Sequence, residues 1–148
     1  MAIQSLVAAK KVCELRNWNA TNLEVNKILY FASMVFLGRN GVDNPLVMDH
    51  FEAWDYGPVL PIVYHKAKAF RNGPIEDAVF RSLPELESGN EADIIAETVS
   101  ALSDKSAGDL VAITHWEHGA WAKHYSPGAK GIMIPNSDIF QEYRTRVG

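Results

Sequence analysis

The sequence contains one cysteine, Cys13, and no long apolar run. A single thiol cannot form a disulfide within the chain, whereas small secreted domains commonly depend on several. The apolar stretch 28–37 is well short of the roughly 18 residues that a membrane-spanning helix needs. The first residues do not combine a basic region, an apolar block and a small-residue cleavage site, as a secretory segment would. These absences predict a cytoplasmic protein.

The sequence also lacks the short motifs of several enzyme classes. It contains neither of the glycine patterns that hold phosphates, G-x-G-x-x-G and G-x-x-x-x-G-K, and no serine in a G-x-S-x-G turn. Cys13 lies in a segment that we expect to be half buried, and a buried thiol without a cationic neighbour is inert. Phosphate-cradling loops and nucleophilic catalysis are therefore not indicated.

The sequence has fewer basic than acidic residues. The 148 residues include 14 Lys and Arg against 18 Asp and Glu, a net charge of -4, so we expect no nucleic-acid partner. Residues 76–97 hold seven acids and one base. This segment is either an ordinary solvated face or a surface that attracts a basic partner.

What is present predicts one mainly α domain over residues 1–148. The length suits a single core, and periodic apolar positions indicate five or six helices with at most a two-stranded ribbon. The apolar stripe of the helix at 22–36 is wide enough to imply burial on more than one side. The expected helices lie at 2–16, 22–36, 58–70, 92–102, after Ser106, and at 136–144; short strands are expected at 50–54 and 132–135, and a loop at 126–131.

Local signals place the ends of these helices. Thr21 and Glu24 fit a capping box, in which each side chain bonds the other residue's backbone N–H, and Ser106 with Asp109 repeats the pattern. Gly38 or Gly41 is expected to end the second helix, because glycine adopts left-handed conformations at little cost. Gly57-Pro58 is expected to begin the third helix, and the last helix to begin near Ser137.

A metal site is one chemical alternative. His115, Glu117, His118 and His124 lie close in sequence, and on a helix His115 and His118 would share a face. The spacing differs from the H-E-x-x-H pattern of zinc proteases. A metal-dependent enzyme that uses His115, Glu117 and His118 therefore stays open beside a structural role for these side chains.

Glu52 and Asp55 suggest a second alternative, a general acid and base pair. In a strand at 50–54, Glu52 would share a face with Trp54, where desolvation can raise the pKa of a carboxyl group. Nothing in the sequence supplies a substrate pocket or a third catalytic group, so the pair does not by itself predict an enzyme.

Three stretches together resemble one protein family. They are VNKILYFASMVFL (25–37), FEAWDYGPV (51–59) within the longer block 51–70, and LVAITHWEHGAW (110–121). The family is that of the Panacea domain, also known as the SocA-like antitoxin or phage-associated domain. The resemblance extends over about residues 3–143, and the middle block is its most specific part.

The resemblance implies a helical, non-enzymatic antitoxin that neutralises a toxin by direct contact. In one branch of the family the antitoxin is instead an adaptor that presents the toxin to the protease ClpXP. We expect neither a cofactor nor a bound metal. Matching motif positions and neighbouring polar or aromatic tips give the candidate partner-binding residues Lys27, Glu52, Trp54, Asp55, Tyr56, Tyr64, His115 and Trp121.

Overall fold

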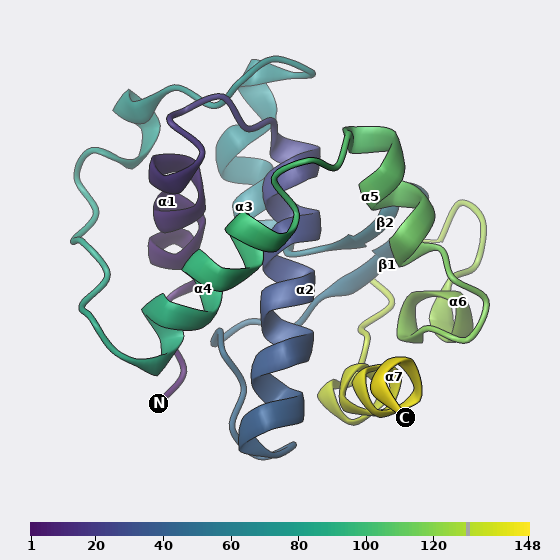
Figure 1. Ribbon diagram of the computed structural model, residues 1–148. Helices are drawn as coiled ribbons and strands as arrows, with labels where there is room; N and C mark the ends of the chain where they lie inside the picture. The colour runs from purple at the N-terminus through teal and green to yellow at the C-terminus, as the bar shows by residue number, and fades with distance from the viewer. Residues whose placement is uncertain (130) are drawn as a thin grey trace.

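One long helix, α2 (Asn22–Asn40), runs through the middle of the computed structural model (Figure 1). Helices α1, α3, α4, α5 and α7 and strand β2 all contact it, and its side chains are buried around most of its circumference. This confirms the burial that the wide apolar stripe predicted. The structure describes residues 1–129 and 131–148, so Lys130 of the expected loop at 126–131 lies outside the described residues.

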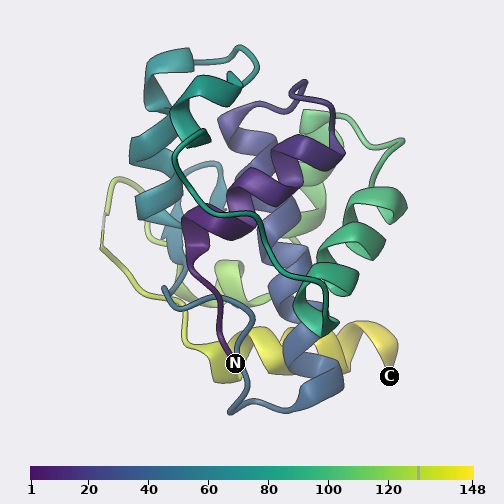
Figure 2. The same ribbon diagram turned by 90° about the vertical axis from the view of Figure 1, so that its left-hand side faces the viewer.

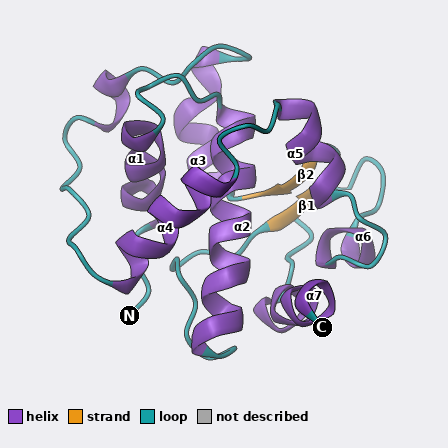
Figure 3. Ribbon diagram, viewed as in Figure 1, coloured by secondary structure: helices purple, strands orange, loops and turns teal. Residues whose placement is uncertain are grey.

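The remaining elements surround α2, and the chain is mainly α as predicted (Figure 3). Figure 2 shows α1 and α4 crossing the same side of α2, and these three helices contact one another. The other helices are α1 (Ser5–Leu15), α3 (Pro61–Ala67), α4 (Asn90–Ala101), α5 (Ala107–Thr114), α6 (Ala120–His124) and α7 (Asn136–Val147), with 3₁₀ turns η1 (Lys68–Phe70) and η2 (Asp77–Phe80).

Both predicted capping boxes are confirmed. The Thr21 hydroxyl accepts a bond from the Glu24 N–H at 3.2 Å, and the Glu24 carboxylate accepts one from the Thr21 N–H at 3.0 Å. At the other end, α2 continues past Gly38 and stops at Gly41, which has φ +100°. Gly38 has a packing role instead, because a Cβ there would lie 2.1 Å from the Tyr143 ring of α7.

The two-stranded ribbon is present, but its second strand is not the expected one. β1 (Glu52–Trp54) pairs antiparallel with β2 (Gly57–Val59), with Trp54 opposite Gly57. Gly57-Pro58 therefore belongs to a strand, and the prediction that it begins a helix is wrong. The helix α3 begins at Pro61, where a missing N–H removes no helical bond.

The segment at 132–135 lies on the other side of β1 without forming a named strand. The Ala53 N–H bonds the Ile132 carbonyl at 2.9 Å, and the Ile134 N–H bonds the Phe51 carbonyl at 2.8 Å. Glu52 and Met133 form an isolated bridge. After this segment, α7 begins at Asn136, one residue before the expected position.

The short helix α6 has no counterpart among the expected helices and follows a turn at 115–119. Gly119 immediately precedes the first residue of α6. A Cβ on Gly119 would lie 3.1 Å from the Glu142 carboxylate. Glycine thus allows α6 and α7 to approach closely at this point. Within residues 1–129 and 131–148, no helix is both long enough and apolar enough to cross a membrane.

Candidate functional site

A cleft of about 600 Å³ opens between α2, the turn of the β-hairpin, and the α3–η1 segment. Five of the eight predicted partner-binding residues line it. Its lining residues are Asn22, Leu23, Asn26, Lys27, Trp54, Asp55, Tyr56, Val59, Tyr64, Lys68, Arg71, Asn72, Gly128 and Ala129. The sequence blocks at 25–37 and 51–64, which are separated along the chain, therefore form one surface.

Lys27 lies at the floor of this cleft with only 1 % of its surface exposed. Its Nζ donates a hydrogen bond of 2.9 Å to the carbonyl of Pro58 in β2. Burial lowers the pKa of Lys27 to about 7, because desolvation penalises the charged ammonium group. Of the residues predicted to contact a partner, Lys27 thus has little surface to offer, and its visible role is to anchor β2 to α2.

Two asparagines of α2, which are not among the predicted partner-binding residues, hold the other side of the cleft. The Asn26 side-chain oxygen accepts a bond of 2.8 Å from the Leu60 N–H, and Asn22 Nδ2 donates one of 3.0 Å to the Tyr64 carbonyl. Asn26 Nδ2 also bonds the Asn22 side chain at 2.9 Å. Their signal was the i,i+4 spacing of two amides in a buried helix, where polar groups need partners.

Aromatic side chains form the rim. Trp54 and Tyr64 pack edge to face with ring centroids 4.9 Å apart, an arrangement that aromatic quadrupoles favour. Tyr64 is 36 % exposed and Tyr56, at the turn of the hairpin, is 70 % exposed. The rim therefore offers large apolar area that the other described residues leave uncovered.

A stack of three rings, none of which lines the cleft, supports the hairpin. His115 lies on Trp121 with centroids 3.8 Å apart and planes 2° apart, and Trp121 stacks on Tyr125 at 4.4 Å. Trp121 Nε1 donates a bond of 2.7 Å to the Trp54 carbonyl, and the Tyr125 hydroxyl donates one of 2.7 Å to Asp55. His115 and Trp121 thus position the cleft wall instead of lining it.

The electrostatic setting of His115 follows from this packing. Burial lowers the pKa of His115, and the nearby Lys27 charge lowers it further. Its Nε2 is buried without a hydrogen-bond partner within the described residues. A neutral imidazole suits such a place, because a charged ring would need a second acceptor.

Glu52 faces a different hollow from Asp55. Its carboxylate accepts a bond of 2.9 Å from Trp54 Nε1, as the shared face of the strand predicted. It lines a groove of about 360 Å³ with Asp49, His50, Pro61, Ile62 and Met133. Since Asp55 lines the larger cleft and bonds Tyr125, the two carboxylates do not form the paired site considered from the sequence.

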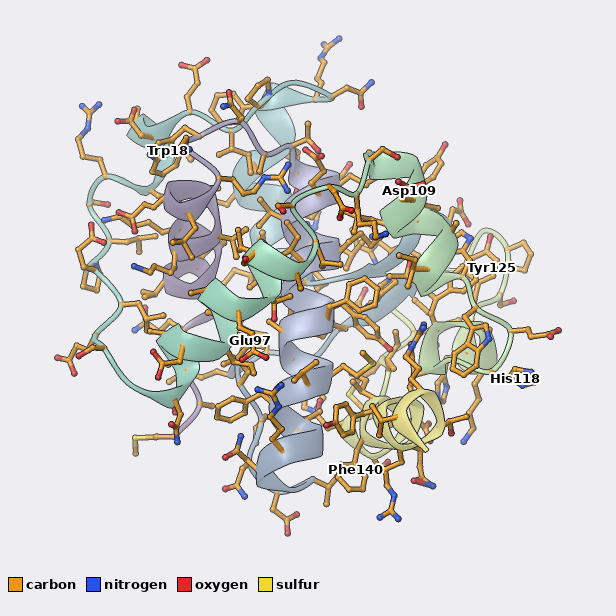
Figure 4. All side chains as sticks on the ribbon, in the orientation of Figure 1. Trp18, Glu97, Asp109, His118, Tyr125 and Phe140 are labelled. Atoms are coloured by element: carbon orange, nitrogen blue, oxygen red, sulfur yellow. The ribbon has the colours of Figure 1, made fainter. Side chains whose placement is uncertain are left out.

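The premise of the metal site is wrong, because His115 and His118 do not share a helical face. The helix α5 ends at Thr114, and residues 115–119 form a turn. Figure 4 shows His118 at the outer edge of the molecule, and its side chain is 63 % exposed. Over the residues that the structure describes, no three His, Cys, Asp or Glu side chains gather in a way that could hold a metal ion.

Comparisons with known proteins bear on the same region. A family model described as "Antitoxin SocA-like, Panacea domain" matches residues 25–122, which is more than half of the chain. The sequence is 52% identical over 44 residues to "Antitoxin SocA" of Caulobacter vibrioides (strain NA1000 / CB15N). That match spans 30% of this chain and 22% of the relative. No solved structure matches the chain significantly.

Proposed function

Because the chain belongs to the antitoxin SocA-like, Panacea domain family, we propose that it neutralises a toxin by direct protein contact, without catalysis. The observation that carries the proposal is the aromatic cleft. All of its rim at 54–64 and two of its four α2 residues, Asn26 and Lys27, fall inside the matched residues 25–122. The toxin is expected to be the product of a neighbouring gene, and the contact to take place in the cytoplasm.

The structure of the rim supports a binding surface. Tyr56 and Tyr64 expose large rings, and exposed aromatic side chains near the middle of an interface commonly supply much of the binding energy. The floor beneath them is fixed by the bonds from Asn22, Asn26 and Lys27. A rim held on a rigid floor loses little conformational entropy when a partner binds.

Co-expression tests this function. The neighbouring gene's product is expressed alone and with this protein, and growth is measured; we expect the product alone to stop growth and this protein to restore it. The two proteins should also co-purify. A product that is harmless alone, or one that neither binds this protein nor is neutralised by it, would contradict the proposal.

The adaptor mechanism is a finer form of the same function. If the protein delivers the toxin to ClpXP, adding it to purified ClpXP and toxin should shorten the toxin's lifetime in proportion to the complex formed. An unchanged toxin lifetime would reject delivery and leave neutralisation by binding in place.

A further inference from the structure

The cleft carries positive charge on a chain whose net charge is -4. Lys68 and Arg71 line it with exposed side chains, and among the described residues neither side chain forms an ion pair or a hydrogen bond. Asp55 is the one carboxylate of the lining, and it already accepts the Tyr125 hydroxyl. Within residues 1–129 and 131–148, the cleft therefore has two free cationic groups beside its aromatic rim.

Arg71 occupies a backbone position that favours glycine. Its φ of 54° and ψ of -121° fit the first central position of a type II′ turn, and the Gly73 N–H closes this turn on the Phe70 carbonyl at 2.9 Å. A side chain at positive φ strains the backbone, and such strain often accompanies functional sites. The geometry of the turn favours glycine at position 71. The chain has an arginine there instead, and its guanidinium group lies at the cleft.

The acidic segment at 76–97 commits most of its charge within the chain, and none of its residues lines the cleft. Four of its seven carboxylates are in ion pairs within the chain: Asp77 with Arg81, Glu85 with Lys10, Glu91 with the N-terminal amine, and Glu97 with Arg39. Figure 4 shows Glu97 on α4, on the side of α2 away from Tyr125 and the hairpin. The cleft, in which Lys68 and Arg71 stand beside a single carboxylate that is already bonded, is therefore complementary to an acidic ligand.

We propose that the cleft binds a segment of the partner in which Asp or Glu side chains stand beside a large apolar side chain. The carboxylates pair with Arg71 and Lys68, since a guanidinium group matches the two oxygens of a carboxylate. The apolar side chain packs on Trp54, Tyr56 and Tyr64. This inference rests on the proposed function, for which it names the chemistry of the ligand.

Lys27 at the floor would respond to such a ligand. Its pKa of about 7 leaves the amine only partly charged at neutral pH. An approaching carboxylate stabilises the ammonium form, so binding should draw a proton to Lys27. A net proton uptake on binding at neutral pH is thus a second expected signature.

Selection from random peptides displayed on phage tests the inference. The bait is the purified wild-type protein, and selected peptides should be rich in Asp and Glu next to Trp, Phe or Leu. A synthetic copy of the strongest peptide should bind the K68A/R71G variant at least about tenfold more weakly than wild type. Arg71→Gly relieves backbone strain, so loss of binding by misfolding is not expected, and thermal unfolding checks this.

The matched control is K66A/R144A, which removes the same two charges from exposed positions outside the cleft lining. It should bind the peptide within about twofold of wild type, because neither side chain lines the cleft and exposed charges are screened by salt. Selection of basic or uncharged peptides, equal binding by wild type and K68A/R71G, or a selection that yields no binder would each overturn the inference.

The same variants separate this inference from the proposed function. If wild type neutralises the toxin and K68A/R71G does so equally well, the acidic ligand is wrong and the antitoxin function stands. If wild type neutralises no toxin but selects acidic peptides that need Lys68 and Arg71, the antitoxin function is wrong and the ligand chemistry stands.

Discussion

The Tyr30 hydroxyl of α2 donates a hydrogen bond of 2.5 Å to Glu142 of α7, a residue 112 positions away. The buried carboxylate also accepts the Ala120 N–H at 2.9 Å and pairs with Arg146 at 2.7 Å. One side chain thus connects α2, α6 and α7. Burial and the Glu142 charge raise the pKa of Tyr30, so the phenol stays the proton donor.

Substitutions at these two residues should differ in their effect on the free energy of unfolding. Tyr30→Phe removes one donor and should cost about 1–2 kcal/mol, since the carboxylate keeps its other partners. Glu142→Ala leaves the Ala120 N–H and the Tyr30 hydroxyl unpaired and removes the ion pair of Arg146, which keeps only its bond to the Ile113 carbonyl, so it should cost about 3–5 kcal/mol. Urea unfolding measures both. Thr145→Ala, at an exposed position of α7, is the control, and equal losses for all three variants would contradict the central role of Glu142.

The buried Lys27 should make stability depend on pH. Its pKa is about 7 in the folded protein and near 10.5 in the unfolded chain, so between these values the unfolded state holds more protons. Stability should therefore rise with pH over this window and be lowest below pH 7, where the buried amine is charged. The slope contributed by this one group approaches about 1.4 kcal/mol per pH unit.

Lys27→Met isolates the effect, because methionine keeps the length and removes the titration. The difference in unfolding free energy between wild type and variant should change across pH 7 to 10 in favour of wild type. The lost bond to Pro58 adds only a constant offset. Parallel pH profiles for the two proteins would show that Lys27 is not desolvated in the folded state.

Gly57 should tolerate no side chain. It has φ +115°, and a Cβ would lie 2.7 Å from Lys27 Cε and 2.9 Å from Thr114 Oγ1. Gly57→Ala should therefore lower stability by about 3 kcal/mol or more, from backbone strain and overpacking together. Gly128→Ala is the matched control, since Gly128 has φ +74° and open space around it. The control should lose only about 1–2 kcal/mol of stability, from backbone strain. If thermal unfolding shows similar losses for Gly57→Ala and Gly128→Ala, crowding against Lys27 is ruled out as a cause.

The sequence predicted the elements that rest on local signals. Both capping boxes could be predicted because the two residues of each box are three positions apart. The buried helix α2 could be predicted from the width of its apolar stripe. The hairpin was missed because Gly57-Pro58 also fits a helix start. Only the pairing of Trp54 with Gly57, across a two-residue turn, decides between the two.

The candidate site was predictable in part for the same reason. Trp54, Tyr56 and Tyr64 lie in one sequence block, so their common surface could be expected. Arg71 and Asn22 join it only because α3, which leads into η1, packs on α2, and no spacing in the sequence reports that contact. His115 and Trp121 were expected at the surface, whereas their stacking places them behind the hairpin.

Substitution of Tyr56 should weaken toxin binding while leaving the stability of the fold nearly unchanged. Because its ring is 70 % exposed and lines the cleft, Tyr56→Ala should change unfolding free energy by less than about 0.5 kcal/mol. Affinity for the toxin found by co-expression should nevertheless fall by about tenfold or more, measured by titration calorimetry, if the ring is an anchor of the interface. Met48→Ala is the control, since Met48 is 60 % exposed and does not line the cleft. Equal affinity of wild type and Tyr56→Ala would place the toxin contact elsewhere on the protein, and a loss shared by Met48→Ala would make it a broad surface instead of this cleft.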